Sequence, residues 1–318
     1  MLQQTRVETV IPYFERFLRL FPTLPDLARA PLSKILKAWA GLGYYARARN
    51  LHAAAQTICR ELGNKIPRTK EDLLRLPGFG PYTAGAVASI AFNQPVAALD
   101  GNVKRILGRL FPGGNRLSRG GSKKELEKSL EEWIPAGRAS DFNQALMDLG
   151  AAICLPSRPR CSVCPLFRFC GAKGEIKDRK TPARKFREET WAIALVEKEG
   201  KFLLHRNEAK GLLAGLWQFP KTVVKKTQDA DKGCEDPGKL LKKLLHENFG
   251  LRVKIVSPLP GQEYFFTHIH ARMKPYRCSL VEATTSPSFP KAARWVKPSN
   301  FPRFAISTAM RRIAEQIA

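Results

Sequence analysis

Residues 76–85 place two glycines between two stretches of helical composition. They read Leu-Pro-Gly-Phe-Gly-Pro-Tyr-Thr-Ala-Gly, and the helical stretch before them, residues 71–74, is ended by a proline. Gly78 and Gly80 can adopt the positive φ angles of a tight turn, and Pro81 suits the first position of a new helix. The small residues that follow let backbone amides approach a partner closely, and a helix N-terminus attracts phosphate. The segment therefore predicts a helix–hairpin–helix whose turn can bind an anion.

A lone carboxylate follows this segment. Asp100 ends an apolar run and precedes residues 103–110, which have helical composition. Taken alone, Asp100 is also compatible with a helix N-cap, and the glycine pair with an ordinary loop. A dinucleotide-binding fingerprint is disfavoured, because a helix precedes the glycines and Thr83 stands where that pattern needs glycine.

The charge of the chain points to a polyanionic partner. The 318 residues, enough for two domains, contain 54 Lys and Arg against 28 Asp and Glu, giving a net charge of +26. The excess is shared, with 31 basic and 15 acidic residues in 1–186 and 23 and 13 in 187–318. A solvated basic surface is the simpler alternative, but an excess of this size favours DNA or RNA.

The sequence indicates neither export nor membrane insertion. No apolar run approaches the ~20 residues of a membrane span, and charged residues interrupt the N-terminal stretch where a signal peptide would be apolar. We therefore expect a cytoplasmic protein whose seven cysteines are mostly reduced or metal-bound.

Four of those cysteines lie within 17 residues and form the strongest local signal in the chain. Cys154, Cys161, Cys164 and Cys170 have the spacing C-x6-C-x2-C-x5-C and are flanked by arginines and lysines. Four thiolates so close in sequence can ligate zinc or a [4Fe–4S] cluster. Zinc sites usually show two C-x2-C pairs and only one is present, so the spacing leaves the metal open.

Hydrophobic periodicity predicts helices through the first half of the chain, at residues 1–21, 31–40, 46–62, 103–110, 123–133 and 141–153. The first helix either begins with a capping box at residues 5–8 or starts in mid-helix. Residues 41–50 join two tyrosines and two arginines in a glycine loop. Such a loop suits wedging into stacked bases and holding phosphates, or it is simply a helix–helix connection.

A change of pattern marks a second domain. Residues 175–190 are rich in charge and read as a linker, after which strands are expected at 191–196 and 201–205 around a turn at 199–200. Helices are expected at 239–248 and 305–317, so this half is predicted to be α+β. His268 and His270 suggest a metal only weakly, and hairpin positions explain them better.

Together these motifs resemble the MutY-type adenine DNA glycosylases of the helix-hairpin-helix superfamily, over nearly the whole chain. The resemblance rests on residues 1–5, 41–45, the hairpin, 99–104, 142–150, the four cysteines and a C-terminal part similar to MutT (Nudix) domains. It implies an all-α helix-hairpin-helix glycosylase domain at 1–174 with an iron–sulfur loop at 154–170, a linker at 175–190, and an α+β Nudix-like recognition domain at 191–318. The implied activity is hydrolytic removal of adenine mispaired with 8-oxoguanine or guanine in double-stranded DNA. The implied cofactor is a [4Fe–4S] cluster, and the implied state is a monomer without membrane contact. The implied location is the cytoplasm of a bacterium, in association with the nucleoid.

The resemblance also implies roles for matching residues. Asp100 would stabilise the cationic sugar, Tyr82 and Asn102 would support it, and Gln144 would line the adenine pocket. The cluster would be ligated by Cys154, Cys161, Cys164 and Cys170, and the gap left by the flipped base would be filled or flanked by Gln4, Thr5, Leu42 and Tyr44. Further DNA contacts would come from Gly78, Gly80 and Lys104. The 8-oxoguanine would be recognised by Phe266, Thr267 and His268. Thr267 replaces the serine of the family's Phe-Ser-His loop.

Three departures from related enzymes shape the expected activity. Relatives that also cut the strand have a lysine nucleophile where this chain has Tyr82, so base removal without a strong lyase step is expected. The family's general-acid glutamate lies two residues before the Met that is residue 1 here, so we expect a mis-called or truncated start and slow adenine removal by this form. Residues 242–250 retain one carboxylate of the Nudix metal helix, which indicates a recognition module.

Three other functions compete with adenine excision. A non-catalytic DNA-binding protein is favoured by the missing acid, and an endonuclease III-like glycosylase/lyase is disfavoured by Tyr82 and the extra domain. A nucleotide pyrophosphohydrolase is disfavoured by the broken metal helix.

Overall fold

The computed structural model describes residues 1–111, 123–174, 185–208, 211–224, 235–283 and 289–317. The chain divides into two compact units, Met1–Ala55 with Ala183–Ala318, and Gln56–Pro182. Residues 175–184 of the predicted linker lie outside the described residues. Within the described ranges, no helix has the length and apolar character needed to cross a membrane.

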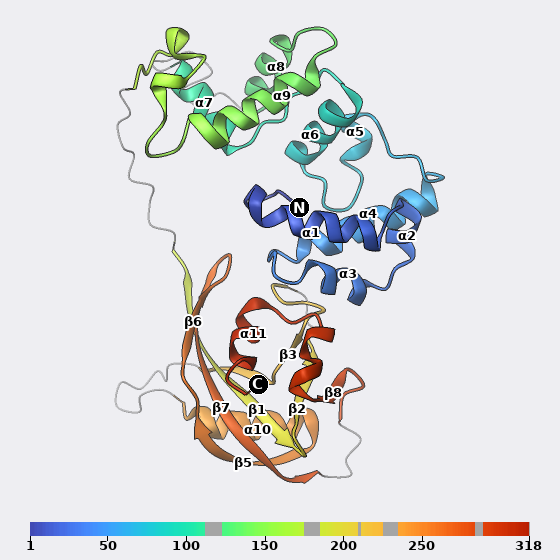
Figure 1. The fold of residues 1–318 in the computed structure, drawn as a ribbon, viewed down its shortest axis with the longest axis vertical. Coiled ribbons are helices and arrows are strands. Elements are labelled where there is room, and N and C mark those ends of the chain that lie inside the picture. Colours follow the sequence, from blue (N-terminus) through green and yellow to red (C-terminus); the bar gives the residue numbers. More distant parts are fainter. Residues whose placement is uncertain (112–122, 175–184, 209–210, 225–234, 284–288, 318) are drawn as a thin grey trace. The chain divides into compact units, whose positions relative to one another are not determined.

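The first unit begins with a group of helices (Figure 1). They are α1 (Val7–Leu20), α2 (Leu24–Arg29), α3 (Leu32–Trp39) and α4 (Ala46–Glu61), of which α4 crosses the division between the units. The Phe17 ring contacts those of Phe21 and Trp39, with centroids 4.8 and 5.9 Å apart. The predicted helices at 31–40 and 46–62 are confirmed. We did not predict α2, although Thr23 caps it and a proline lies in its first turn.

The predicted start of the first helix is wrong. Helix α1 begins at Val7, and Arg6 before it makes no side-chain cap, so neither a capping box nor a start in mid-helix is present. Instead the Thr5 amide donates to the Leu2 carbonyl at 3.2 Å, closing a turn. The hydroxyl of Thr5 accepts a hydrogen bond from Arg47, so a long-range contact replaces the local cap.

The second part of this unit is built on a sheet that has eight strands in the described residues. They are β1 (Arg187–Lys198), β2 (Lys201–Arg206), β3 (Trp217–Gln218), β4 (Lys221–Val224), β5 (Leu251–Pro258), β6 (Gln262–Phe265), β7 (Ile269–Ala283) and β8 (Ala293–Val296). The main order is β3-β2-β1-β7-β5, while β4 pairs with β1, β6 with β7 and β8 with β2. Strands β1 and β7 run parallel, from Arg187 beside Ile269 to Glu197 beside Ser279. This pairing starts β1 inside the predicted linker, where a charged sequence hides the strand.

The predicted hairpin between the first two strands is confirmed. Glu199 and Gly200 have φ angles of 51° and 68°, which matches the two-residue turn that suits the twist of paired strands.

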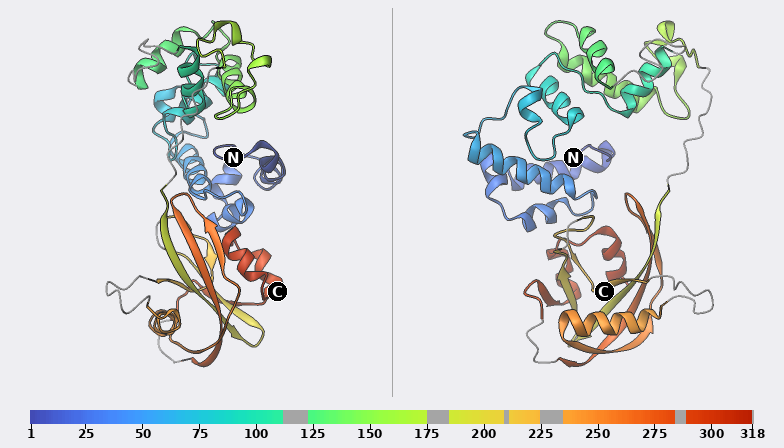
Figure 2. Two further views of the ribbon diagram at one scale, coloured as in Figure 1. Left: turned by 90° about the vertical axis from the view of Figure 1, so that its left-hand side faces the viewer. Right: turned by 180° about the vertical axis from the view of Figure 1, so that it is seen from behind.

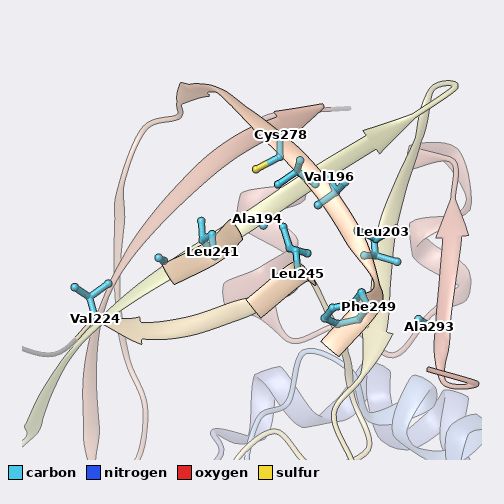
Figure 3. Packing of buried hydrophobic residues seen from close by; sticks show 12 residues of the cluster. Ala194, Val196, Leu203, Val224, Leu241, Leu245, Phe249, Cys278 and Ala293 are labelled. Atoms are coloured by element: carbon cyan, nitrogen blue, oxygen red, sulfur yellow. The ribbon is translucent and has the colours of Figure 1, made fainter. Parts of the chain in front are cut away.

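Helix α10 (Pro237–Phe249) covers one face of this sheet (Figures 1 and 2). Its apolar side buries Leu241, Leu245 and Phe249 in a cluster with residues of the sheet, among them Ala194, Val196, Leu203 and Cys278 (Figure 3). On the opposite face, Phe202, which neighbours Leu203 in β2, meets Phe301 of the 3₁₀-helix η4 (Pro298–Arg303) edge to face, with ring centroids 6.5 Å apart. Helix α11 (Thr308–Ala314) closes the chain. The α+β prediction for this half is confirmed.

The second unit is helical. It contains α5 (Lys70–Leu73), α6 (Pro81–Phe92), α7 (Gly101–Leu110), α8 (Lys123–Glu132) and α9 (Ala139–Asp148), followed by a π-helix η1 (Leu149–Ile153) and the 3₁₀-helices η2 (Cys161–Val163) and η3 (Phe167–Phe169). Its core includes Leu99, Val103, Leu107 and Leu130. The described residues before β1 contain no strand, as predicted. The predicted helix at 141–153 changes to π geometry at Leu149, which sequence periodicity does not signal.

Candidate active site

The glycine hairpin joins α5 to α6 through a turn of type II character. The Phe79 amide donates to the Leu76 carbonyl at 3.2 Å, and Gly78 has the φ of 80° that this turn requires. The expected positive φ is wrong for Gly80, whose φ of −90° belongs to the extended residue that precedes α6. Pro81 begins α6 as predicted, and no side chain caps that helix. No atom lies within 4 Å of a Cβ built on Gly80, so the backbone at the start of α6 is open to close approach by a partner.

The carboxylate of Asp100 lies at the N-terminus of α7 and is half-buried. One oxygen accepts the amide of Val103 at 2.8 Å, so the simpler N-cap role is real. The other accepts the side-chain amide of Asn102 at 3.2 Å. A negative charge at this position is stabilised by the helix dipole. The cap thus fixes one oxygen and leaves the second with a single side-chain donor.

Tyr82, in the first turn of α6, lies close enough to Asp100 to feel its charge. Burial first, and then the charge of Asp100, raise the pKa of the Tyr82 hydroxyl, which therefore keeps its proton at neutral pH. That hydroxyl lies 3.8 Å from the sulfur of Met147 on α9. Gln144, on the same helix, is exposed, and its amide donates to the Ser140 hydroxyl at 3.0 Å. The structure therefore gathers Tyr82, Asp100 and Asn102, while Gln144 bonds within its own helix.

The extended segment that leads to Asp100 pairs with side chains. Asn143, which is 2% exposed, accepts the amide of Ala98 at 2.8 Å and donates to the carbonyl of Val96 at 3.0 Å. The amide of Ala97 donates to Glu131 at 3.2 Å. The ammonium of Lys70 in turn lies 3.3 Å from Glu127 and 3.6 Å from Glu131. We did not predict these contacts. The signal that could have indicated them is Asn143 itself, a polar residue beside Gln144 in a predicted helix. A polar side chain that becomes buried needs hydrogen-bond partners.

Two glycines allow close packing around this site. A Cβ on Gly85 would collide with the carbonyl of Ala97, and one on Gly150 would lie 2.8 Å from the Cβ of Asn102. Gly85 belongs to α6 and Gly150 to the π-helix, so both elements approach the Asp100 region as closely as a backbone can.

A continuous set of hydrogen bonds connects Asp100 to the cysteine loop. Arg105 donates to the Asn102 side chain at 2.8 Å, and Asn102 donates to Asp100. The same guanidinium donates to the carbonyl of Gly150 at 2.9 Å and to that of Cys154 at 2.9 Å. The position of the catalytic candidate and that of the first cysteine are thus fixed by one side chain of α7.

The four predicted cysteines line one pocket, together with Arg109 and Phe167. It encloses about 350 Å³ of space that no atom fills, part of which is open to solvent. Arg109 donates to the Cys154 sulfur at 3.2 Å and to the carbonyl of Leu155 at 2.7 Å. Burial first, and then the other three cysteines, raise the pKa of the Cys161 thiol. In the part of the chain that the structure describes, no three His, Cys, Asp or Glu side chains are placed to hold a single metal ion.

The predicted glycine loop between α3 and α4 presents some of its residues and buries others. Tyr44 is 39% exposed, whereas Leu42 is 6% exposed and Tyr45 is buried. The two arginines of the loop, which were expected to hold phosphates, both bind backbone carbonyls of the chain itself. Arg47 binds the loop and the N-terminal turn, and Arg49 donates to the carbonyl of Ala214 at 2.9 Å.

The triplet Phe266–His268 forms the turn between β6 and β7. The Phe266 amide donates to the Ile269 carbonyl at 2.8 Å, and its ring packs on Trp191 with centroids 5.1 Å apart. Thr267 is half-buried and His268 is exposed. The ring nitrogens of His270 lie 2.9 Å from Glu188 and 3.1 Å from Glu263. These contacts connect the adjacent strands β1, β7 and β6 next to the turn, so His270 has a structural role in the hairpin.

Comparison with known proteins assigns both parts of the chain. Residues 1–136 match the model of the HhH-GPD superfamily of base excision DNA repair proteins, and residues 191–316 match that of a NUDIX domain. The chain is 34% identical to the adenine DNA glycosylases of Rattus norvegicus and Homo sapiens, over 361 and 363 residues. Both alignments cover 98% of this chain, but only 69% and 66% of the relatives. A solved thermostable thymine-DNA glycosylase matches 55% of this chain and 81% of its own, with 31% identity and a TM-score of 0.50.

These matches define the class as helix-hairpin-helix base excision repair glycosylases with a C-terminal Nudix-like domain. Within that class, the chain belongs to the adenine DNA glycosylase family. It is thereby a DNA-binding repair enzyme, as the sequence motifs indicated.

Proposed function

We propose that this chain excises adenine opposite 8-oxoguanine or guanine in duplex DNA, acting as a monomer on chromosomal DNA. The observation that carries the proposal is the Asp100 carboxylate beside the glycine hairpin. It caps the N-terminus of α7 and accepts a hydrogen bond from the Asn102 side chain. Family membership supports the reaction, and the net charge of +26 supports the substrate.

The proposed reaction divides between binding and charge stabilisation. A base inside a duplex cannot be reached, so adenine must first be extruded into the enzyme. Cleavage of the N-glycosidic bond then leaves positive charge on the deoxyribose, which a nearby carboxylate stabilises. Adenine leaves with the bonding electron pair and takes up a proton, and the oxygen of a water molecule forms the new bond to C1′ as the water gives up a proton. Asp100 supplies that charge in our proposal. Asn102 orients it, and Tyr82 stays protonated and can donate to an oxygen of the substrate.

We propose that Cys154, Cys161, Cys164 and Cys170 hold a [4Fe–4S] cluster. The four thiols line one common pocket, which supports a single group held by all four. The resemblance to MutY-type glycosylases favours a cluster, in which each iron binds one cysteine. The cluster would supply structural support to the loop. Visible absorption and iron analysis of purified protein test this, and zinc with no absorption would contradict it.

We propose that base removal occurs without a strong strand-cleaving step. Tyr82 stands at the position where lyase relatives have a lysine, and a phenol cannot form a Schiff base. Borohydride should therefore trap no covalent complex with DNA, and a trapped complex would contradict the assignment.

The test of the main proposal is the variant Asp100→Asn. It keeps an acceptor for the Val103 amide but removes the negative charge. Losing an electrostatic stabiliser of this kind costs about 10²–10³-fold in rate. Single-turnover cleavage of an A:8-oxoguanine duplex, followed by alkali, is expected to show that loss. The affinity of the variant for the same duplex should remain at least as high as its affinity for an A:T duplex. Equal excision rates for Asp100→Asn and the wild type would contradict the proposal.

We further propose that the Nudix-like domain reads the opposite base through Phe266, Thr267 and His268. The exposed His268 and the packed Phe266 support a turn that is presented rigidly. Residues 242–250 retain only one carboxylate of the Nudix metal helix, Glu247, which supports recognition without nucleotide hydrolysis.

A further inference from the structure

The Arg47 side chain is the centre of a contact between the N-terminal turn and the glycine loop. It begins in the first turn of α4 and is half-buried. Its terminal nitrogens donate to five oxygens, namely the carbonyls of Met1 (2.6 Å), Gln3, Leu42 (3.3 Å) and Gly43 (3.2 Å) and the hydroxyl of Thr5 (3.0 Å). Both terminal nitrogens are engaged, and the remaining Nε is buried without a hydrogen-bond partner. The guanidinium therefore exposes no unused donor to a DNA phosphate.

Two strained residues lie next to the carbonyls that Arg47 binds. Gln4 has a φ of 59° and Tyr44 a φ of 49°, values that residues other than glycine rarely adopt. Gln4 directly follows the Gln3 carbonyl, and Tyr44 directly follows the Gly43 carbonyl. Backbone strain of this kind persists only where surrounding contacts over-determine it, and it is common at sites that clamp ligands. Arg47 supplies such contacts on both segments.

The planar guanidinium also contacts aromatic rings. Its centre lies 5.4 Å from the Trp39 ring centroid and 5.5 Å from that of Tyr44. Trp39 is buried, so it provides a fixed surface, whereas Tyr44 is 39% exposed. Lysine has neither the plane nor the forked donors needed to make these contacts together.

We propose that Arg47 is the positioning residue of the surface that probes the mispair. It joins two segments that are far apart in sequence and presents Gln4 and Tyr44 to the base stack in left-handed backbone conformations. The inference rests on the proposed function and on the resemblance to MutY-type glycosylases, which assigns both residues to the gap left by the extruded adenine. The partner of this surface is the stacked bases around that gap, and Arg47 itself touches no DNA.

The test uses Arg47→Lys with Arg16→Lys as the matched control. Arg16 also donates to one backbone carbonyl, that of Ala38 at 2.8 Å, and lies over the Tyr13 ring, but it contacts neither segment. Extrusion is followed by the fluorescence of 2-aminopurine placed opposite 8-oxoguanine in a duplex. We expect Arg47→Lys to reduce the fluorescence rise at least tenfold and to change the affinity for an undamaged duplex less than threefold. We expect Arg16→Lys to extrude the base at the wild-type level.

A stability measurement keeps the inference testable if Arg47→Lys binds DNA poorly. Glycine adopts a positive φ without strain, so Gln4→Gly removes part of what Arg47 offsets. The drop in melting temperature caused by Arg47→Lys should therefore be smaller in a Gln4→Gly background, while the drop caused by Arg16→Lys should be the same in both backgrounds.

The outcomes separate the two proposals. If Arg47→Lys extrudes the base as well as the wild type does, the positioning role is overturned and the proposed function stays intact. A wild-type protein that extrudes nothing opposite 8-oxoguanine would overturn both. Equal melting-temperature losses in the two backgrounds would also overturn the positioning role.

Discussion

Asp100 uses its two carboxylate oxygens for different purposes. One accepts the Val103 amide and begins α7, and the other accepts the Asn102 side chain. A helix cap fixes both the position and the direction of the carboxylate, which is what electrostatic stabilisation of a developing charge requires. The structural role and the proposed chemical role are therefore compatible, because the cap is what aims the charge.

Asn143 gives the clearest stability prediction for a single side chain. Asn143→Ala leaves the Ala98 amide and the Val96 carbonyl without their partners, and an unsatisfied buried group costs about 1–3 kcal/mol. We expect the free energy of unfolding to fall by roughly 2–4 kcal/mol in urea titrations. The control is Gln144→Ala on the exposed side of the same helix, for which a change within about 0.5 kcal/mol is expected. Equal effects of the two variants would contradict the assignment.

His205 predicts how stability depends on pH. Burial first, and then the charge of Lys221, lower the pKa of His205 to about 4 from its ordinary 6.5. Between these values the unfolded chain binds more protons than the folded one, so stability falls as pH falls. The full loss, reached below pH 4, is about 3 kcal/mol. Unfolding free energies of wild type and His205→Gln at pH 7 and pH 4.5 measure this. The wild type should lose more, and parallel losses would contradict the prediction.

Among the elements, the π-helix η1 is the one that most closely constrains the site. Gly150 in η1 lies against Asn102, and its carbonyl accepts a hydrogen bond from Arg105. Gly150→Ala would place a methyl group 2.8 Å from the Asn102 Cβ. Overpacking of this kind costs about 1–3 kcal/mol, and here it also displaces a supporter of Asp100. We expect lower stability in urea titrations and slower single-turnover excision of adenine.

The control for this substitution is Gly108→Ala in the exposed part of α7. No atom lies within 4 Å of a Cβ built there, so alanine should stabilise the helix by about 0.5–1 kcal/mol. Excision should remain at the wild-type rate. A Gly150→Ala variant as stable as Gly108→Ala would show that the close approach has no energetic consequence.

Elements whose signals are local could be predicted from the sequence. The hairpin turn at Gly78, the start of α6 at Pro81 and the turn at 199–200 each depend on the φ preference of one or two residues. The start of α1 and the start of β1 could not be predicted in this way. Arg47 draws the first into a turn, and parallel pairing with β7 extends the second into a charged sequence.

The residues of the candidate site divide along the same line. Asp100 and the four cysteines are visible in sequence because their residue types and spacing carry the chemistry. Arg47 and Asn143 were assigned no specific supporting role, because they act on segments more than 40 residues away along the chain. Such contacts become visible only once the fold brings the segments together, and they are the ones that position the site.

At the scale of the whole molecule, the positive charge is distributed rather than confined to one motif. Residues 1–186 and 187–318 each carry an excess of lysine and arginine, and the net charge of +26 includes both. Long-range attraction therefore brings DNA to either part of the chain, whereas recognition of a mispair needs the few residues of the sites described above. Affinity and specificity should accordingly respond to different variables.

Salt provides the test of that division. Each neutralised phosphate releases counterions, so a protein with roughly 6–10 phosphate contacts loses about 10³–10⁵ in affinity between 50 and 200 mM salt. We expect equilibrium titrations to show a loss of this size for both an A:8-oxoguanine duplex and an undamaged duplex. Because phosphate contacts carry no sequence information, the two slopes should agree while the affinities differ. Lys104→Ala, beside Asp100, should lower both slopes by about one. A slope that differs between the duplexes would mean that mispair recognition itself depends on additional phosphate contacts.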